Sequence, residues 1–201
     1  MQVNVSDEER VLILLSTSRL TLSPPLHRQA DELLRYYERN RLHLKQWEPE
    51  KADDFFTLGA MERRIRDMTR RMEEQQSLHL LLRDRFTDVI LGECGFTNIV
   101  RGPFQACHLG FSIDQPSEGR GLMHEGLTSA IDFAFSTLGL HRIMANYRPE
   151  NRRSHALLQR LGFEQEGRAA SYLMIDGEWR DHVLSSLINP LERDPDERRE
   201  C

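Results

Sequence analysis

A loop with two glycines, set between a strand-like and a helix-like segment, constrains this chain more than any other stretch. The unit consists of residues 104–114 (FQACHLGFSID), residues 115–121 (QPSEGRG) and residues 122–138, whose apolar side chains recur at helical spacing. Gly119 and Gly121 have no Cβ, so the backbone there can turn sharply and approach a ligand. The following helix offers unpaired N–H groups and the positive end of its dipole. The unit therefore predicts an anion site suited to a pyrophosphate, to which Arg120 would add a charge-assisted contact.

The loop differs from the commoner phosphate-binding patterns. Neither GxGxxG nor Gly-Lys-Ser/Thr occurs, and two glycines before a helix can also form nothing more than a tight turn. The next unit supports the ligand-binding interpretation. Asn146 ends a strand-like segment, Asn151 and Ser154 open a helix, and Leu161-Gly162-Phe163 closes it at a spacing that places this helix beside the loop.

The rest of the chain alternates between strand and helix patterns, without repeats or linkers. Further strands are predicted at 18–23, 78–83, 88–99, 141–147, 163–172 and 179–188, and helices at 27–39, 57–76 and 150–161. The last two strands form a hairpin around Asp176-Gly177. One stripe of the second helix, made of Leu58, Met61, Ile65, Met68 and Met72, is predicted to be core. Locally paired strands mixed with strand–helix–strand units indicate an α/β fold with a mixed sheet.

The composition and the ends of the chain bound its organisation. Of the 201 residues, 39% are hydrophobic and 29% charged, which is typical of one globular domain. We expect a single domain over residues 10–190, a flexible N-terminus over residues 1–9 and a flexible charged tail over residues 191–201. No apolar run approaches the roughly 20 residues that span a bilayer. The expected location is the cytoplasm, away from membranes.

Charge and cysteine usage exclude several other classes. A net charge of −5 argues against DNA binding. The arginines between Arg63 and Arg71 predict the solvated face of a helix, with a docking surface for RNA or an acidic partner as the alternative. Three cysteines without CxxC spacing and eight histidines without HxH or HxxxH spacing predict neither a disulfide framework nor a metal site. Cys94 and Cys107 are predicted to be buried rather than to act as nucleophiles.

The two units together resemble the GCN5-related N-acetyltransferases (GNAT). That family has a Q/R-x-x-G-x-G/A loop, then N-x-x-S, then L-G-F, which here are Gly119-Arg120-Gly121, Asn151-Arg152-Arg153-Ser154 and Leu161-Gly162-Phe163. Pro116 departs from the pattern, because it stands where the family has Gln or Arg and Gln115 is shifted by one. The resemblance implies acetyl-CoA as the donor, direct transfer, and a mixed, mostly antiparallel sheet of six to seven strands flanked by about four helices.

Other segments between residues 16 and 188 resemble the RimJ/RimL group, and its RimJ branch more than its RimL branch. These segments are residues 17–20 (TSRL), 47–49 (WEP), 98–102 (NIVRG), 141–147 (HRIMANY) and 175–182 (IDGEWRDH). The resemblance implies an N-terminal alanine of a small-subunit ribosomal protein as the acceptor. It leaves open whether the protein associates with the ribosome and whether it is a monomer or a homodimer. The alternatives are a GNAT enzyme for another amine, such as a small molecule or an antibiotic, and a non-catalytic acyl-CoA-binding, ribosome-associated protein.

The resemblance also implies which residues hold the donor. The backbone of Phe111, Ser112 and Ile113 would pair with the pantetheine arm, and an N–H near Ile113 would stabilise the oxyanion. The remaining expected contacts to coenzyme A are Ser117, Glu118, Gly119, Arg120, Gly121, Leu122, Asn146, Asn151 and Ser154. For Asn146, capping of a turn at the strand end is an equal alternative.

Amide formation needs an acid for the leaving thiolate and a base for the amine. The resemblance implies that Ser154, the serine of N-x-x-S, donates to the leaving thiolate, although it could simply occupy the first turn of its helix, and Tyr147 or Tyr172 could replace it as the acid. An α-amine with a pKa of about 8 is already neutral in about a tenth of molecules at pH 7, so a weak base suffices.

The base itself stays unassigned. The place of the RimL glutamate is Leu173 here, and Glu93, inside a strand, is the first candidate. Glu93 could instead pair with a basic neighbour or face solvent. Asp181 and Glu48 are further candidates.

Overall fold

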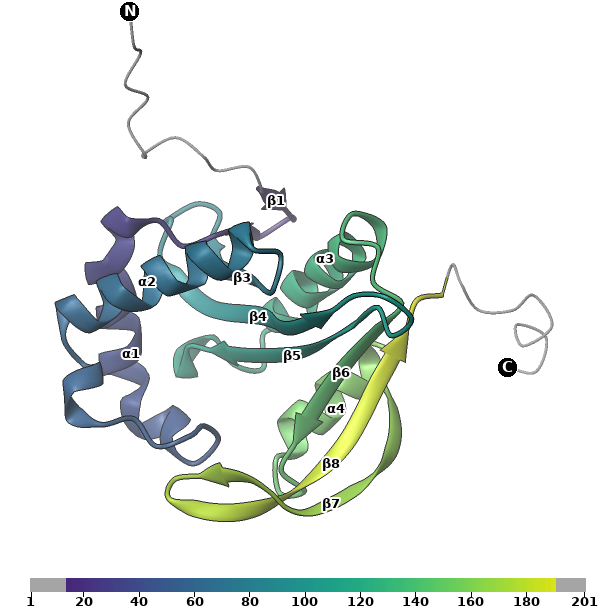
Figure 1. The fold of residues 1–201 in the computed structure, drawn as a ribbon. Helices are drawn as coiled ribbons and strands as arrows, with labels where there is room; N and C mark the ends of the chain where they lie inside the picture. The colour runs from purple at the N-terminus through teal and green to yellow at the C-terminus, as the bar shows by residue number, and fades with distance from the viewer. Residues whose placement is uncertain (1–13, 191–201) are drawn as a thin grey trace, which may run out of the picture.

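One sheet of eight strands separates two pairs of helices (Figure 1). The computed structural model describes residues 14–190. The strands are β1 (Leu15–Ser16), β2 (Leu20–Ser23), β3 (Leu78–Asp84), β4 (Ile90–Val100), β5 (Ala106–Ile113), β6 (Arg142–Tyr147), β7 (Glu164–Ile175) and β8 (Glu178–Ile188). The helices are α1 (Ala30–Lys45), α2 (Leu58–Glu73), α3 (Leu122–Ser136) and α4 (Arg152–Arg160). The strand order is β1-β2-β3-β4-β5-β6-β8-β7, and only the β5–β6 pairing is parallel.

The predicted α/β fold with a mixed, mostly antiparallel sheet is confirmed, but the strand count exceeds the predicted six to seven. The additional strand is β1, whose two residues pair with β2 and are too few to show an alternating pattern. The predicted flexible ends, residues 1–9 and 191–201, lie outside the described residues. Within residues 14–190, no helix is long and apolar enough to cross a bilayer.

Each face of the sheet has its own core. Helices α3 and α4 pack on the face that carries Leu80, Cys94 and Leu109, whereas α1 and α2 pack on the face that carries Leu81 and Ile90. The predicted core stripe of α2 is confirmed for Met61, Ile65 and Met68, which are buried, and Met72 is partly buried. The prediction was wrong for Leu58, which is exposed because it lies in the first turn, where the helix has not yet reached the core.

The parallel strands β5 and β6 separate after three paired residues. They pair from Ala106–Arg142 to His108–Met144. Beyond that point β5 stays paired with β4 as far as Ile113, and β6 stays paired with β8 as far as Tyr147. The two strands therefore diverge towards their carboxyl ends, where the loop before α3 begins (Figure 1).

Candidate functional site

The opening between β5 and β6 belongs to a cleft of about 1130 Å³. We call the part lined by residues of 111–124 and 146–154 the donor half. We call the part lined by Tyr37, residues 47–51, Arg64, His79, residues 93–97 and Gly110 the acceptor half. The two halves meet at β5, so a ligand in one can contact a ligand in the other.

The glycine loop of the donor half has the backbone geometry expected of an anion site. Gly119 and Gly121 have positive φ angles of 71° and 75°, and Gly121 is the N-cap of α3. The N–H of Glu125 donates to the carbonyl of Gly121 at 3.0 Å, which is the first bond of the helix. The N–H groups of residues 122–124 precede it and have no intrahelical acceptor. Together with the helix dipole, they fit a pyrophosphate.

A distant arginine holds this loop in place. Arg19 donates to the Glu125 carboxylate, with 2.6 Å between Nε and Oε2, and to the Arg120 carbonyl at 2.9 Å. Partial burial raises the pKa of Glu125, but hydrogen bonds from Thr17, Arg19 and Ser18 outweigh this effect and lower that pKa to about 2. Arg120, a predicted ligand contact, is exposed and does not line the cleft.

The start of α4 forms the other wall of the donor half. The Asn151 side chain caps the helix by accepting from the Ser154 N–H at 3.0 Å. Ser154 and Asn146 both line the cleft. Asn146 donates to the Tyr172 hydroxyl at 3.1 Å. Glu118 also lines the cleft, and its carboxylate binds Arg153 and lies 3.2 Å from His43 Nε2.

The end of β5 is fixed by α1, which sequence reasoning did not connect to the site. Asp114 accepts from Arg39 and Asn40, each at 2.7 Å, and Asn40 accepts from the Gln115 N–H at 3.0 Å. Ser112 hydrogen-bonds to the Tyr36 hydroxyl at 2.9 Å. Phe111, Ser112, Ile113 and Ser117 all line the cleft, and Ser117 is largely buried within the loop.

Glu93 stands at the centre of the acceptor half. It lies opposite Ser112 across the β4–β5 pairing. It accepts a hydrogen bond from the Tyr37 hydroxyl and lies 3.5 Å from an Arg64 amino group. The prediction that the arginine run is one solvated helix face was wrong at Arg64. Its side chain turns towards the sheet, because it binds Glu93 and stacks on Tyr37.

The remaining candidates for the base are distributed over two places. Glu48 lines the acceptor half and contacts Lys51. Burial lowers the pKa of Lys51 to about 8. The charge of Glu93 raises this pKa and that of Arg64 lowers it further, but both effects are smaller than that of burial. Asp181 binds Arg168 at 2.9 Å and does not line the cleft. Of the three predicted candidates, Glu93 and Glu48 line the cleft and Asp181 does not.

Neither Cys94 nor Cys107 is placed to act as a nucleophile, although Cys94 is among the residues that line the cleft. Cys94 and Cys107 are buried, as predicted, and burial raises the pKa of both thiols, that of Cys107 to about 12. A thiol with a raised pKa is a poor nucleophile at neutral pH. Among residues 14–190 no three His, Cys, Asp or Glu side chains are grouped so as to hold a metal.

Diverging parallel strands, with a glycine loop and a helix start at their open end, define an acyl-CoA site. A family model described as the acetyltransferase (GNAT) domain matches residues 19–164. The chain is 44% identical over 176 residues to the ribosomal protein uS5-alanine N-acetyltransferase of Escherichia coli (strain K12), covering 88% of this chain and 91% of the relative.

Comparison with solved structures points to the same family. The ribosomal-protein-S5-alanine acetyltransferase from Vibrio fischeri has a TM-score of 0.86 at 34% identity, covering 90% of this chain and all of that one (100%). RimJ of Mycobacterium smegmatis, solved in complex with CoA-disulfide, has a TM-score of 0.82 at 25% identity, covering 87% of this chain and 84% of that one. The chain belongs to the GNAT acetyltransferase family. It is an N-acetyltransferase that uses acetyl-CoA, as the sequence predicted.

Proposed function

We propose that this protein transfers the acetyl group of acetyl-CoA to the α-amine of an N-terminal alanine of the small-subunit ribosomal protein uS5. The observation that carries the proposal is the 44% identity to the E. coli uS5-alanine enzyme, which extends over 88% of this chain. The match includes both halves of the cleft, so it covers the acceptor side as well as the coenzyme side. The reaction would take place in the cytoplasm, where ribosomal proteins are made, on the free protein or on the assembling ribosome.

The donor half supports this reaction through its backbone. The N–H groups at the start of α3 would hold the pyrophosphate, and the unpaired edge of β5 along residues 111–113 would hold the pantetheine arm. The diverging strands then present the thioester carbonyl to the acceptor half. The amine nitrogen attacks that carbonyl carbon, the C–S bond breaks, and the amine loses one proton while the thiolate gains one.

We assign these two proton transfers to Glu93 and Ser154. Glu93 faces the acceptor half, opposite Ser112, where the entering amine must pass. We assign it as the acceptor of the ammonium proton, with Tyr37 and Arg64 holding the carboxylate in position. Ser154 lines the donor half at the start of α4, and its hydroxyl would donate to the leaving thiolate. Glu93 can be a weak base, because an α-amine has a pKa of about 8.

The test is acetyl transfer to a synthetic peptide that copies the N-terminus of uS5 and begins with alanine. Mass spectrometry should show one added acetyl group on the α-amine. A matched peptide whose α-amine is blocked but which keeps an internal lysine should stay unmodified. Modification of the blocked peptide or of small amines alone would point to a different acceptor. Binding of coenzyme A without transfer to any amine would support a non-catalytic acyl-CoA-binding protein.

A further inference from the structure

The acceptor half has a strip of sheet surface in which one pair of residues lacks side chains. On the face of β4 and β5 that α1 and α2 cover, the paired residues are Glu93–Ser112, then Gly95–Gly110, then Thr97–His108. A Cβ at Gly95 would lie 3.0 Å from His79 Nδ1, whereas a Cβ at Gly110 would meet no atom within 4 Å, although Gly110 lies on a central strand. The room for another backbone close to the sheet is therefore over Gly110.

Contacts between distant segments cover one end of this strip. At the carboxyl ends of β5 and β6, the tip of the β7–β8 hairpin meets the segment after α1. The Asp176 N–H donates to the Glu48 carbonyl at 3.4 Å, and Lys45 Nζ lies 3.5 Å from the Asp176 carboxylate. Arg148 adds a hydrogen bond to the Gln46 carbonyl at 2.7 Å. A bound peptide would therefore leave in the other direction, past Gly95 and Thr97.

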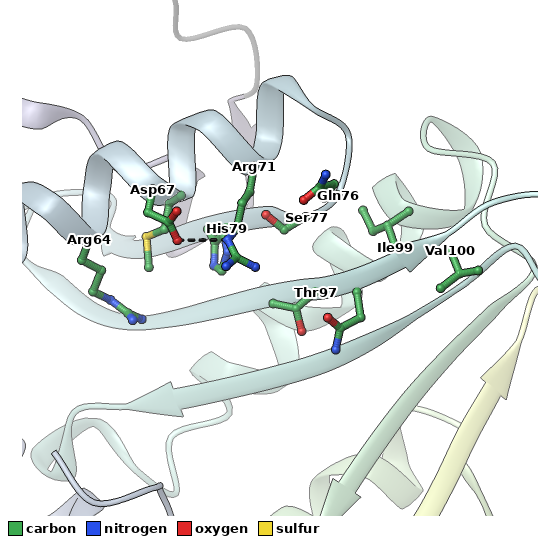
Figure 2. Close-up of a pocket in the computed structure, with 11 residues that line it drawn as sticks. Arg64, Asp67, Arg71, Gln76, Ser77, His79, Thr97, Ile99 and Val100 are labelled. Carbon is green, nitrogen blue, oxygen red and sulfur yellow. Dashed lines mark hydrogen bonds and ion pairs between the residues drawn. The ribbon is translucent and has the colours of Figure 1, made fainter.

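A second pocket, of about 400 Å³, lies in that direction (Figure 2). Its residues come from α2, the start of β3 and the end of β4. It shares Arg64, His79 and Thr97 with the cleft, so the two spaces adjoin. A chain that follows β4 from Glu93 reaches the pocket at Thr97.

The pocket offers hydrogen-bond donors that lack acceptors within the described part of the chain. The Ser77 hydroxyl is buried without a partner, and Ser77 is only 6% exposed. Arg64 Nε is also buried without a partner. Arg71 lies at the rim, as Figure 2 shows, and is exposed.

The pocket's other titratable groups are Asp67 and His79. Asp67 is already bound by Arg70 at 2.6 Å and by Arg71 at 3.0 Å. Burial has the largest effect on the pKa of His79, and the nearby Arg64 has the next largest. Both lower this pKa, which is about 4, so the ring is neutral at physiological pH. Arg64 also pairs with Glu93 through an amino group, and Arg71 binds Asp67 through Nε. Each guanidinium group therefore keeps further N–H donors, and the ligand that fits is a hydrogen-bond acceptor with negative charge.

We propose that this pocket binds the carboxylate of an Asp or Glu in the acceptor peptide, four to six residues from its N-terminus. Four residues separate Glu93 from Thr97, which is about 13 Å at roughly 3.3 Å per strand residue. An extended peptide covers that span with about four residues of its own. The inference rests on the proposed function, because it assumes that a peptide amine is the acceptor.

The first experiment compares alanine-initiated peptides that carry Glu or Gln at position 4, 5 or 6. With the unmodified enzyme, kcat/KM should be about tenfold higher for Glu at one of these positions, the usual size of a partly exposed charge-assisted hydrogen bond. Arg71→Gln should remove this preference, while Asp67 keeps Arg70 as its partner. Arg63→Gln is the matched control, because Arg63 is exposed on the same helix outside the pocket. It should preserve the preference.

The second experiment tests the glycine strip by the length of the acceptor. Two acceptors are compared, a ten-residue peptide and alaninamide, and only the peptide is long enough to cross residue 110. Gly110→Val should therefore lower kcat/KM for the peptide about tenfold relative to kcat/KM for alaninamide. Gly167→Val is the control, since Gly167 also lies in a strand with open space around it but does not line the cleft.

The possible outcomes separate the two proposals. Absence of transfer to every alanine peptide overturns the proposed function. Transfer with equal rates for Glu and Gln, at all three positions, overturns the pocket assignment alone.

Discussion

The two halves of the cleft are built in different ways. The donor half uses two short stretches of chain, residues 111–124 and 146–154, and its binding groups are mainly backbone N–H groups and glycines with positive φ. The acceptor half collects side chains from α1, the segment after it, α2, β3 and β4, and links them by hydrogen bonds and ion pairs. We expect the first construction to hold acetyl-CoA, the donor that the family uses, and the second to determine which acceptor is bound.

The strongest test of this division is Glu93→Gln, which removes the proposed proton acceptor from the acceptor half. General-base catalysis contributes on the order of 100-fold or more, so kcat should fall by about that factor. The KM for acetyl-CoA should change far less, because the donor half lacks this side chain. Steady-state kinetics with the alanine peptide at several acetyl-CoA concentrations would measure both values.

Asp181→Asn is the matched control, because Asp181 is a carboxylate outside the cleft. It should keep the full rate. A Glu93→Gln enzyme with full kcat would exclude Glu93 as the base and return attention to Glu48.

The corresponding test of the donor half is Gly121→Val. Residue 121 has a φ of 75°, which a β-branched residue adopts only at a cost of about 1–2 kcal/mol. The N-cap would shift and misalign the N–H groups of residues 122–124, so the affinity for coenzyme A should fall about tenfold. Titration calorimetry with coenzyme A measures this change.

Gly139→Val provides the control for backbone strain. Gly139 has a φ of 63°, lies between α3 and β6, and does not line the cleft. Its replacement should cost stability without loss of coenzyme A affinity. An equal loss in both variants would show that strain, rather than the position of the loop, sets the affinity.

The same contrast explains what could be predicted from the sequence. Gly119, Gly121 and Asn151 act within a few residues of their position, so local patterns were enough to place the loop and the cap of α4. Hydrophobic periodicity likewise located seven of the strands and all four helices. It missed β1, which exists only because two residues pair with β2.

The acceptor half depends on contacts between residues far apart in the chain. Tyr37 and Glu93 are 56 residues apart, and Arg64 and Glu93 are 29 apart. Helical spacing places Arg64 beside the apolar stripe of α2, three residues after Met61 and four before Met68, whereas Arg63 and Arg66 lie on the opposite side of the helix. This spacing could have singled out Arg64, but only the packing of α1 and α2 on the sheet shows that its partner is Glu93.

A smaller effect is expected at Ser154, where the donor half supplies a side chain. Ser154→Ala should lower kcat about tenfold, the value of one hydrogen bond to a leaving group, and should affect the KM for acetyl-CoA less. Ser154→Thr retains a hydroxyl and should recover most of the rate. If the Ala and Thr variants both had the kcat of the unmodified enzyme, the role of Ser154 would be limited to forming the first turn of α4.

The smallest effect concerns one of the distant contacts that hold the donor half in place, the contact between Arg19 and Glu125. Hydrogen bonds keep the pKa of Glu125 at about 2, below its ordinary value of 4.5. A carboxyl whose pKa is lower in the folded state stabilises the fold above the unfolded pKa, and this contribution is lost as pH falls from about 4.5 to 2.

At pH 6, Glu125→Gln should therefore lower the free energy of unfolding by about 1 kcal/mol, since Arg19 is half exposed and solvent screens the pair. Urea unfolding at pH 6, 4 and 3 should show this difference shrinking with the pH. Glu73→Gln, at an exposed site on α2, should show no such trend. A difference that persists unchanged at pH 3 would mean that Glu125 acts by packing. In that case the glycine loop would owe its position to its own backbone and to its contacts with Asn40 and His43 of α1, rather than to Arg19.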